Sequence, residues 1–245
     1  MKTNYMIAVC DILGFERLVE TQPLDAVVDN AIGWFRKALY YSLHKDGFPG
    51  SVPELQELEA HPDVGVAWFS DTVLLYTLRD DETCVRNLIS TVGWLLFLTI
   101  VEGRTRIRGG ISYGEAYINS KNSLFVGTPI IEAYRLEQSQ QWAGAALTKA
   151  AVERIPEVAR SGRFADWWII PYPVPVKEGT LDTLAVKWTL GDHHPSWKQV
   201  WSDSREEPND SDWAKQPDVC EKFINTKAFH DLTCTWCNKS PRRVG

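Results

Sequence analysis

Two apolar runs separated by only three residues, at positions 64–69 and 73–78, constrain the fold of this 245-residue chain more than any other feature. Strands joined by so short a link predict a β-hairpin that turns through Ser70, Asp71 and Thr72. We therefore expect the core of the chain to contain an antiparallel sheet.

The segments on either side of the hairpin predict the rest of that sheet. A short buried strand at residues 6–10 is followed by a helix that begins at Pro23 and keeps one apolar face over five turns. After the hairpin, a helix is expected over residues 82–102 and a strand over residues 106–113. This strand–helix–strand–strand–helix–strand order predicts an α+β fold, a ferredoxin-like βαββαβ core with both helices on one face of the sheet.

The composition of the chain changes near residue 163. Before that point, a short extended segment is expected at residues 124–126, a helix at 129–141 and a strand at 145–148. Seven of the eleven tryptophans lie from Trp167 onward. We therefore divide the chain into a core domain, residues 1–163, and a C-terminal Trp-rich extension, residues 164–245, that packs on the core.

Two aspartates lie where predicted strands meet turns. Asp11 follows the first strand, and Asp71 is in the hairpin. In the predicted plan the first strand is central and lies beside the hairpin, so the two carboxylates can approach each other. Paired carboxylates at such a turn suit a divalent cation held against a phosphate-bearing ligand.

Charge and hydropathy exclude several function classes. The formal net charge is −6, so the chain as a whole is not expected to bind nucleic acid or an anionic membrane. The longest apolar run, residues 92–101, is too short to span a bilayer, and the N-terminus does not resemble a signal peptide. We expect a cytoplasmic protein whose five cysteines are reduced thiols.

Four segments, in this order, resemble the class III nucleotidyl cyclase catalytic domain, the adenylate and guanylate cyclase family. Residues 11–15 (DILGF) look like the first metal loop, and residues 69–71 (FSD) look like the second, where the family usually has glycine before the aspartate. Residues 108–114 (RGGISYG) are similar to the Arg-x-Gly-Ile strand of the family, and residues 126–136 (VGTPIIEAYRL) to its glycine-to-arginine helix.

The resemblance implies a mechanism and a set of site residues for the core domain, residues 1–163. Two Mn²⁺ or Mg²⁺ ions would be held by Asp11, Asp71 and the carbonyl of Ile12, and Arg135 would stabilise charge at the α-phosphate. The family works as head-to-tail dimers, so a homodimer with composite active sites is implied. Phosphate and nucleotide contacts would come from the backbone of three residues at the first metal loop: Leu13, Gly14 and Phe15.

The chain departs from the family at the helix motif and at the base pocket. Ile131 occupies the position of a family asparagine, and Ala67 and Leu124 occupy the positions at which adenylate cyclases carry a lysine and an aspartate. Because neither side chain forms hydrogen bonds, the usual recognition of a purine is not expected. Phe69 and Tyr41 are further candidates for the base pocket.

A class III-like core with apolar residues at the base positions resembles the Pycsar pyrimidine cyclases of bacterial anti-phage defence. That resemblance implies conversion of UTP, or CTP, to cyclic UMP or cyclic CMP, which a separate effector then reads. Two alternatives stay open: a purine cyclase with a remodelled base pocket, and a degenerate cyclase fold that binds nucleotide without turnover.

Two other groups of residues have a structural and a functional interpretation. Arg108 is expected to have a structural role. Cys234 and Cys237, with Cys220 and His230, are either a zinc site or buried thiols in a Trp-rich tail.

Overall fold

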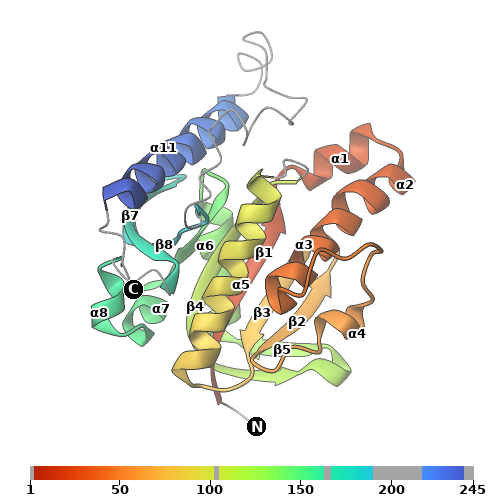
Figure 1. The fold of residues 1–245 in the computed structure, drawn as a ribbon, viewed down its shortest axis with the longest axis horizontal. Coiled ribbons are helices and arrows are strands. Elements are labelled where there is room, and N and C mark those ends of the chain that lie inside the picture. The colour runs from red at the N-terminus through yellow and green to blue at the C-terminus, as the bar shows by residue number, and fades with distance from the viewer. Residues whose placement is uncertain (1–2, 102–104, 163–166, 190–216, 240–245) are drawn as a thin grey trace.

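The structure is a computed structural model that describes residues 3–101, 105–162, 167–189 and 217–239, with side chains up to residue 234. The described residues form one eight-stranded mixed sheet in the order β2-β3-β1-β4-β6-β8-β7, and β5 pairs with β4 outside this path (Figure 1). Four strands make up its N-terminal half: β1 (Thr3–Ile12), β2 (Val64–Phe69), β3 (Thr72–Thr77) and β4 (Ile107–Asn119).

The order of these four strands is that of a ferredoxin-like sheet, which confirms the predicted fold class. The central strand β1 pairs antiparallel with β3 on one side and with β4 on the other. Helices α3 (Gly33–His44) and α5 (Glu82–Val101) cover one face of the sheet (Figure 1). The hairpin of β2 and β3 forms as the spacing of the apolar runs predicts.

The alternation of side chains along β1 assigns its residues to the two faces of the sheet. Met6, Ala8 and Cys10 belong to the main core beneath α3 and α5. Ile7 belongs to a second, smaller cluster with Tyr76 and Ala116 on the opposite face. Asp11 lies four residues after Ile7, an even number, and therefore faces the same side of the sheet as this smaller cluster.

Helix α6 (Thr128–Ser139) packs on that opposite face, and a glycine makes its close approach possible. A Cβ atom added to Gly110 of β4 would lie 2.0 Å from the carbonyl oxygen of Ala133 in α6. No side chain fits between atoms at that distance, so only glycine lets the helix lie this close to the strand.

The helix predicted from Pro23 is divided in the structure. A short helix α1 (Phe15–Thr21), which the sequence did not predict, is followed by α2 (Leu24–Ala26), a π-helical segment (Val27–Ile32) and α3. Helix α5 alone among the described helices is long and apolar enough to cross a membrane, and most of it is buried. Its leucines Leu88, Leu95 and Leu96 are fully buried in the main core, which accounts for its apolar composition.

Strand β4 ends six residues later than predicted, at Asn119 instead of residue 113. It continues to Asn119 because β5 (Leu124–Gly127) folds back and pairs with residues 116–119. The short helix and strand expected next are present as α6 and β6 (Gly144–Leu147).

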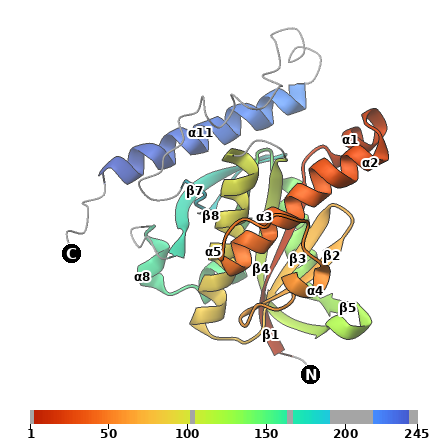
Figure 2. The same cartoon turned by 45° about the vertical axis from the view of Figure 1, so that its right-hand side comes forward.

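The C-terminal part continues the same sheet. Helices α7 (Lys149–Arg154) and α8 (Glu157–Arg160) lead to strands β7 (Ile169–Val176) and β8 (Gly179–Val186), and β8 pairs with β6. Helix α11 (Pro217–Lys239) lies beside β7 and β8 in both views (Figures 1 and 2). Its Phe229 is fully buried, with its ring centroid 4.8 Å from that of Trp142.

Candidate active site

The structure brings Asp11 and Asp71 together at the end of the central strand. Asp11 is paired across the β1–β3 ladder with Thr72, the residue next to Asp71. The Thr72 hydroxyl donates a hydrogen bond of 2.8 Å to Asp11 Oδ1, and the Ile12 N–H donates one of 3.3 Å to the carbonyl of Asp71. The two aspartates that the sequence predicts as metal ligands are therefore neighbours at one end of the sheet, where β1 ends and the β2–β3 hairpin turns.

The hairpin turn that carries Asp71 holds a backbone conformation that is unfavourable for its sequence. Ser70 has a φ of 56°, in the left-handed region that favours glycine. The Trp68 indole N–H donates a hydrogen bond of 2.7 Å to the carbonyl of Ser70, and the Trp68 ring packs 4.9 Å from that of Phe35. These contacts hold the turn in place and so fix the position of the Asp71 backbone.

Asp11 lies in an environment that disfavours its charged form. The pKa of Asp11 is raised to about 6, chiefly by burial. The charges of Asp71 and Glu137 also raise it, whereas the hydrogen bond from Thr72 and the charge of Arg108 lower it. Two carboxylates this close repel each other, and a divalent cation between them relieves that repulsion.

A buried polar network lies behind Asp11. Arg108, the partner of Asp11 across the β1–β4 ladder, forms a salt bridge of 2.6 Å from Nε to Glu137 Oε1 and donates from Nη1 to the carbonyl of Gln140 at 2.9 Å. The Gln140 side chain donates to the carbonyl of Gly109 at 2.8 Å and accepts from the Trp142 indole N–H at 2.7 Å. Arg108 thus joins the beginning of β4 to the C-terminal end of α6.

The loop after Asp11 supplies part of the predicted phosphate site. Gly14 has a φ of 75° and precedes the first residue of α1, Phe15, so the first N–H groups of this helix have no partner within it. The N–H of Leu13 already donates to the carbonyl of Arg106 at 2.8 Å. Leu13 is therefore not free to bind a phosphate through its amide, and the predicted set of phosphate-binding residues narrows to Gly14 and Phe15.

The side chains present fit a divalent metal held together with a ligand, not a closed protein cage. Within the described residues no group of three or more His, Cys, Asp and Glu side chains is placed to hold a metal ion. Asp11 and Asp71 are hard oxygen donors of the kind that Mg²⁺ and Mn²⁺ prefer, with the Ile12 carbonyl beside them. Phosphate oxygens of a ligand would have to complete the coordination.

Arg135 and Ile131 lie on the exposed side of α6. Ile131 is 52% exposed, and Arg135 is also exposed. Within the part of the chain that the structure describes, Arg135 forms no salt bridge and no side-chain hydrogen bond. Its charge is available to a ligand or to a second molecule.

The base-pocket candidates are divided between two places. Ala67 and Phe69 share the sheet face of Asp11, because Phe69 pairs with Thr72 and Thr72 with Asp11. Leu124 begins β5, at the opposite end of β4 from Arg108. Tyr41 lies elsewhere: it packs between α3 and α5, with its ring 5.6 Å from that of Trp94, on the other face of the sheet. Tyr41 is therefore not part of the predicted base pocket, because α3 places it on the other face of the sheet.

Helix α11 does not bring the four candidate zinc ligands together. Cys234 Sγ lies 3.4 Å from His230 Nε2, but Cys220 precedes Cys234 by fourteen residues on the same helix, about 21 Å along its axis. The side chain of Cys237 lies outside the described residues. The interpretation that Cys220 belongs to a zinc site with Cys234 and His230 is therefore wrong.

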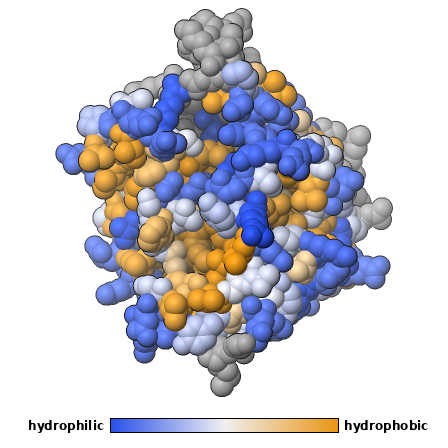
Figure 3. Space-filling view, turned by 180° about the vertical axis from the view of Figure 1, so that it is seen from behind, coloured by the Kyte–Doolittle hydropathy of each residue, from blue (hydrophilic) through white to orange (hydrophobic). Residues whose placement is uncertain are grey.

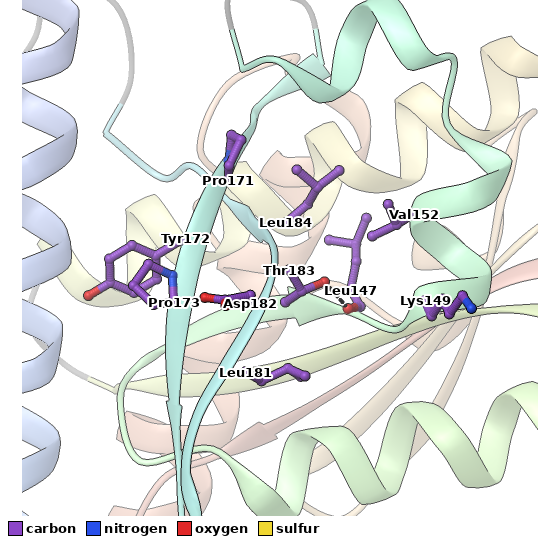
Figure 4. Close-up of a pocket in the computed structure, with 10 residues that line it drawn as sticks. All are labelled: Leu147, Lys149, Val152, Pro171, Tyr172, Pro173, Leu181, Asp182, Thr183 and Leu184. Atoms are coloured by element: carbon purple, nitrogen blue, oxygen red, sulfur yellow. Dashed lines mark hydrogen bonds between the residues drawn. The ribbon is translucent and has the colours of Figure 1, made fainter.

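A separate open pocket of about 710 Å³ lies between α7 and the β7–β8 hairpin (Figure 4). Leu147, Val152 and Leu184 give it an apolar wall, with Lys149 and Asp182 among the residues that line it. It shares no residue with the aspartate site, and its lining lacks the paired carboxylates that phosphate-transfer chemistry requires.

Residues around Asp11 include some that the sequence did not single out. Thr72 follows from the hairpin once its register with β1 is known. Glu137 and Gln140 carry no local signal, because only the packing of α6 on β4 turns them toward Arg108.

No known protein family and no curated protein matches the chain in sequence. Solved structures do match. The catalytic core of a rhodopsin-guanylyl cyclase with converted specificity, in complex with ATPalphaS, is 11% identical over 76% of this chain and 97% of its own, with a TM-score of 0.53.

The chain has the fold of a class III cyclase catalytic domain. Two further matches have lower TM-scores. The guanylyl cyclase Cya2 is 14% identical, covering 78% of this chain and 95% of its own, with a TM-score of 0.43. An adenylate/guanylate cyclase/hydrolase from Silicibacter pomeroyi is 13% identical, covering 76% and 98%, with a TM-score of 0.46.

Proposed function

We propose that this protein is a nucleotidyl cyclase that converts a ribonucleoside triphosphate to a 3′,5′-cyclic nucleotide and pyrophosphate. One observation carries the proposal. On a cyclase fold, the register of β1 with β3 brings the carboxylates of Asp11 and Asp71 to one edge of the sheet. A binding module has no need of two adjacent, partly desolvated carboxylates there.

Each residue of the site has a role in this reaction. Asp11 and Asp71, with the Ile12 carbonyl, hold the two divalent ions, Mn²⁺ or Mg²⁺. When bound, these ions supply Lewis-acid activation of the ribose 3′-hydroxyl and offset the charge of the triphosphate. The amides of Gly14 and Phe15 bind phosphate oxygens at the start of α1. Arg135 stabilises the charge that develops at the α-phosphate.

Arg135 acts from the partner subunit of a head-to-tail homodimer. The sheet face that α3 and α5 leave open supports such an interface, since apolar side chains gather on it (Figure 3). Phe69, which lies on the same face as Asp11, is 82% exposed, and Tyr134 of α6, which packs on that face, is 53% exposed, although both side chains are large and hydrophobic. Exposed apolar side chains gathered on one face are typical of an interaction surface.

The substrate is a pyrimidine nucleotide, UTP in preference to CTP. Ala67 and Leu124, at the positions where adenylate cyclases read the purine, offer no hydrogen bond through their side chains. A site that does not pair the polar edge of a purine loses much of the selectivity for it. The product, cyclic UMP or cyclic CMP, then acts in the cytoplasm as a second messenger for an anti-phage effector.

Incubation of the purified full-length protein with MnCl₂ and each of the four ribonucleoside triphosphates tests this proposal, with products resolved by mass spectrometry. Cyclic UMP or cyclic CMP that chelator abolishes is the expected result. Cyclic AMP or cyclic GMP as the main product would refute the pyrimidine assignment and keep the cyclase. No product from any of the four, with nucleotide binding intact, would support a cyclase fold that binds without turnover.

A further inference from the structure

Helix α11 is anchored to the segment that joins α6 to β6. The N–H of Ala143 donates a hydrogen bond of 2.8 Å to Thr226 Oγ1, and Asn225 Nδ2 donates one of 2.8 Å to the carbonyl of Gln141. Phe229, one turn further along α11, is fully buried. Both a polar and an apolar contact therefore fix the position of this helix against the sheet.

This anchoring places Lys222, one helical turn before Thr226, near Arg108 and Glu137 of the polar network behind Asp11. The carbonyl of Lys222 accepts a hydrogen bond of 2.7 Å from Thr226 Oγ1, one helical turn further on. The next strand, β6, begins at Gly144, which pairs with Arg108, and Arg108 pairs with Asp11. The ends of β6, β4 and β1 thus form one edge, and α11 begins above it (Figure 1).

The ammonium group of Lys222 is partly desolvated beside other positive charges. Burial and the charges of Arg108 and Lys177 lower its pKa, against the opposing charges of Asp218 and Glu137. Glu137 already forms a salt bridge with Arg108. Within the described residues Lys222 forms no salt bridge and no side-chain hydrogen bond of its own. An anion bound at this edge would offset the cost of its burial.

We propose that Lys222 binds a phosphate oxygen of the bound nucleotide, so that the C-terminal extension supplies part of the nucleotide site. The inference rests on the proposed function for the identity of the ligand. A purely structural role is the competing explanation, because a cation near the C-terminal end of α6 stabilises that helix end without any ligand.

Binding of inorganic tripolyphosphate to the full-length protein in the presence of Mg²⁺ separates the two explanations, measured by calorimetry. Lys222→Met keeps the apolar stem and removes the charge. We expect it to weaken binding about tenfold, the value of one charge-assisted hydrogen bond. Lys222→Arg should restore most of the affinity. Lys227→Met is the matched control on the same helix, because Lys227 pairs with Asp231 at 2.6 Å, and it should bind as the wild type does.

Wild-type affinity in Lys222→Met, or an equal loss in Lys227→Met, would overturn the inference. A lower melting temperature of Lys222→Met with unchanged binding would assign Lys222 to the structural role. Should Lys222→Met fail to fold, Lys222→Gln replaces it. Because tripolyphosphate binding needs no turnover, it tests Lys222 even if no cyclic nucleotide is formed. A cyclase whose tripolyphosphate affinity is unchanged in Lys222→Met would refute the inference and leave the proposed function standing.

Discussion

The buried ion pair behind Asp11 makes a quantitative prediction about stability. The Glu137 side chain is fully buried and that of Arg108 is 8% exposed, with 2.6 Å between Nε and Oε1. Arg108→Met removes the charge and leaves Glu137 in place without its cation. Breaking a buried pair in this way costs about 3–5 kcal/mol. We expect the free energy of unfolding of Arg108→Met to be lower than that of the wild type by about 3 kcal/mol at pH 8.

The size of this loss should depend on pH. Burial raises the pKa of Glu137, whereas the charge of Arg108 and its hydrogen bond lower it. Without Arg108 the folded-state pKa rises further above the unfolded value, so the folded protein binds the proton more tightly. Stability then falls as pH rises through the interval between the two pKa values. Arg108→Met should therefore lie closer to the wild type at pH 5 than at pH 8.

Urea unfolding followed by tryptophan fluorescence at pH 5, 6.5 and 8 measures these differences. The double variant with Arg108→Met and Glu137→Gln should recover part of the loss, because the uncompensated charge is gone. Lys149→Met is the surface control. Lys149 is 90% exposed and pairs weakly with Glu153, so the control should change stability by less than about 0.5 kcal/mol. A loss in Arg108→Met of less than about 1 kcal/mol at pH 8, or one that is equal at all three pH values, would refute the reasoning.

Three other outcomes are expected. Asp71→Ala should abolish turnover and leave the dimer folded, and mixing it with Arg135→Ala subunits should restore partial activity; inactive heterodimers would contradict the composite site. Ser70→Gly should raise the free energy of unfolding by up to about 1 kcal/mol, because glycine adopts a φ of 56° without strain; a loss in denaturant titrations would contradict this. Mn²⁺ affinity should fall as pH drops below about 6, where Asp11 becomes protonated; a pH-independent affinity by calorimetry would exclude Asp11 as a ligand.

Most of the core fold follows from local features of the sequence. The apolar runs at residues 64–69 and 73–78, with a three-residue link, become β2 and β3, because a short link between strands leaves the chain little choice but a hairpin. The apolar face of residues 82–101 becomes α5 in the main core. Helix α1 was missed, since its seven residues include no buried side chain and so carry no periodic apolar signal.

Some residues of the candidate site could likewise be predicted from local features of the sequence, and others could not. Asp11 and Asp71 stand out in the sequence because an acidic residue at the end of an apolar run has no packing role. The prediction that Tyr41 belongs to the base pocket is wrong, because the sequence does not show which face of the sheet a helix covers. The role of Arg135 is a prediction that the mixed-subunit experiment tests, and the role of the phosphate loop stays a prediction.

The sequence by itself determined the order of strands and helices in the βαββαβ core, the position of the hairpin and the two aspartates that mark the site, because periodicity and turn residues act over a few neighbouring positions. Only the tertiary structure decided that Arg108 faces Asp11 across one ladder, that Glu137 is buried beside Arg108, and that α11 is hydrogen-bonded to the segment between α6 and β6. Strand register and helix docking join residues far apart in the chain. They depend on how whole surfaces fit together, which no local stretch of sequence encodes.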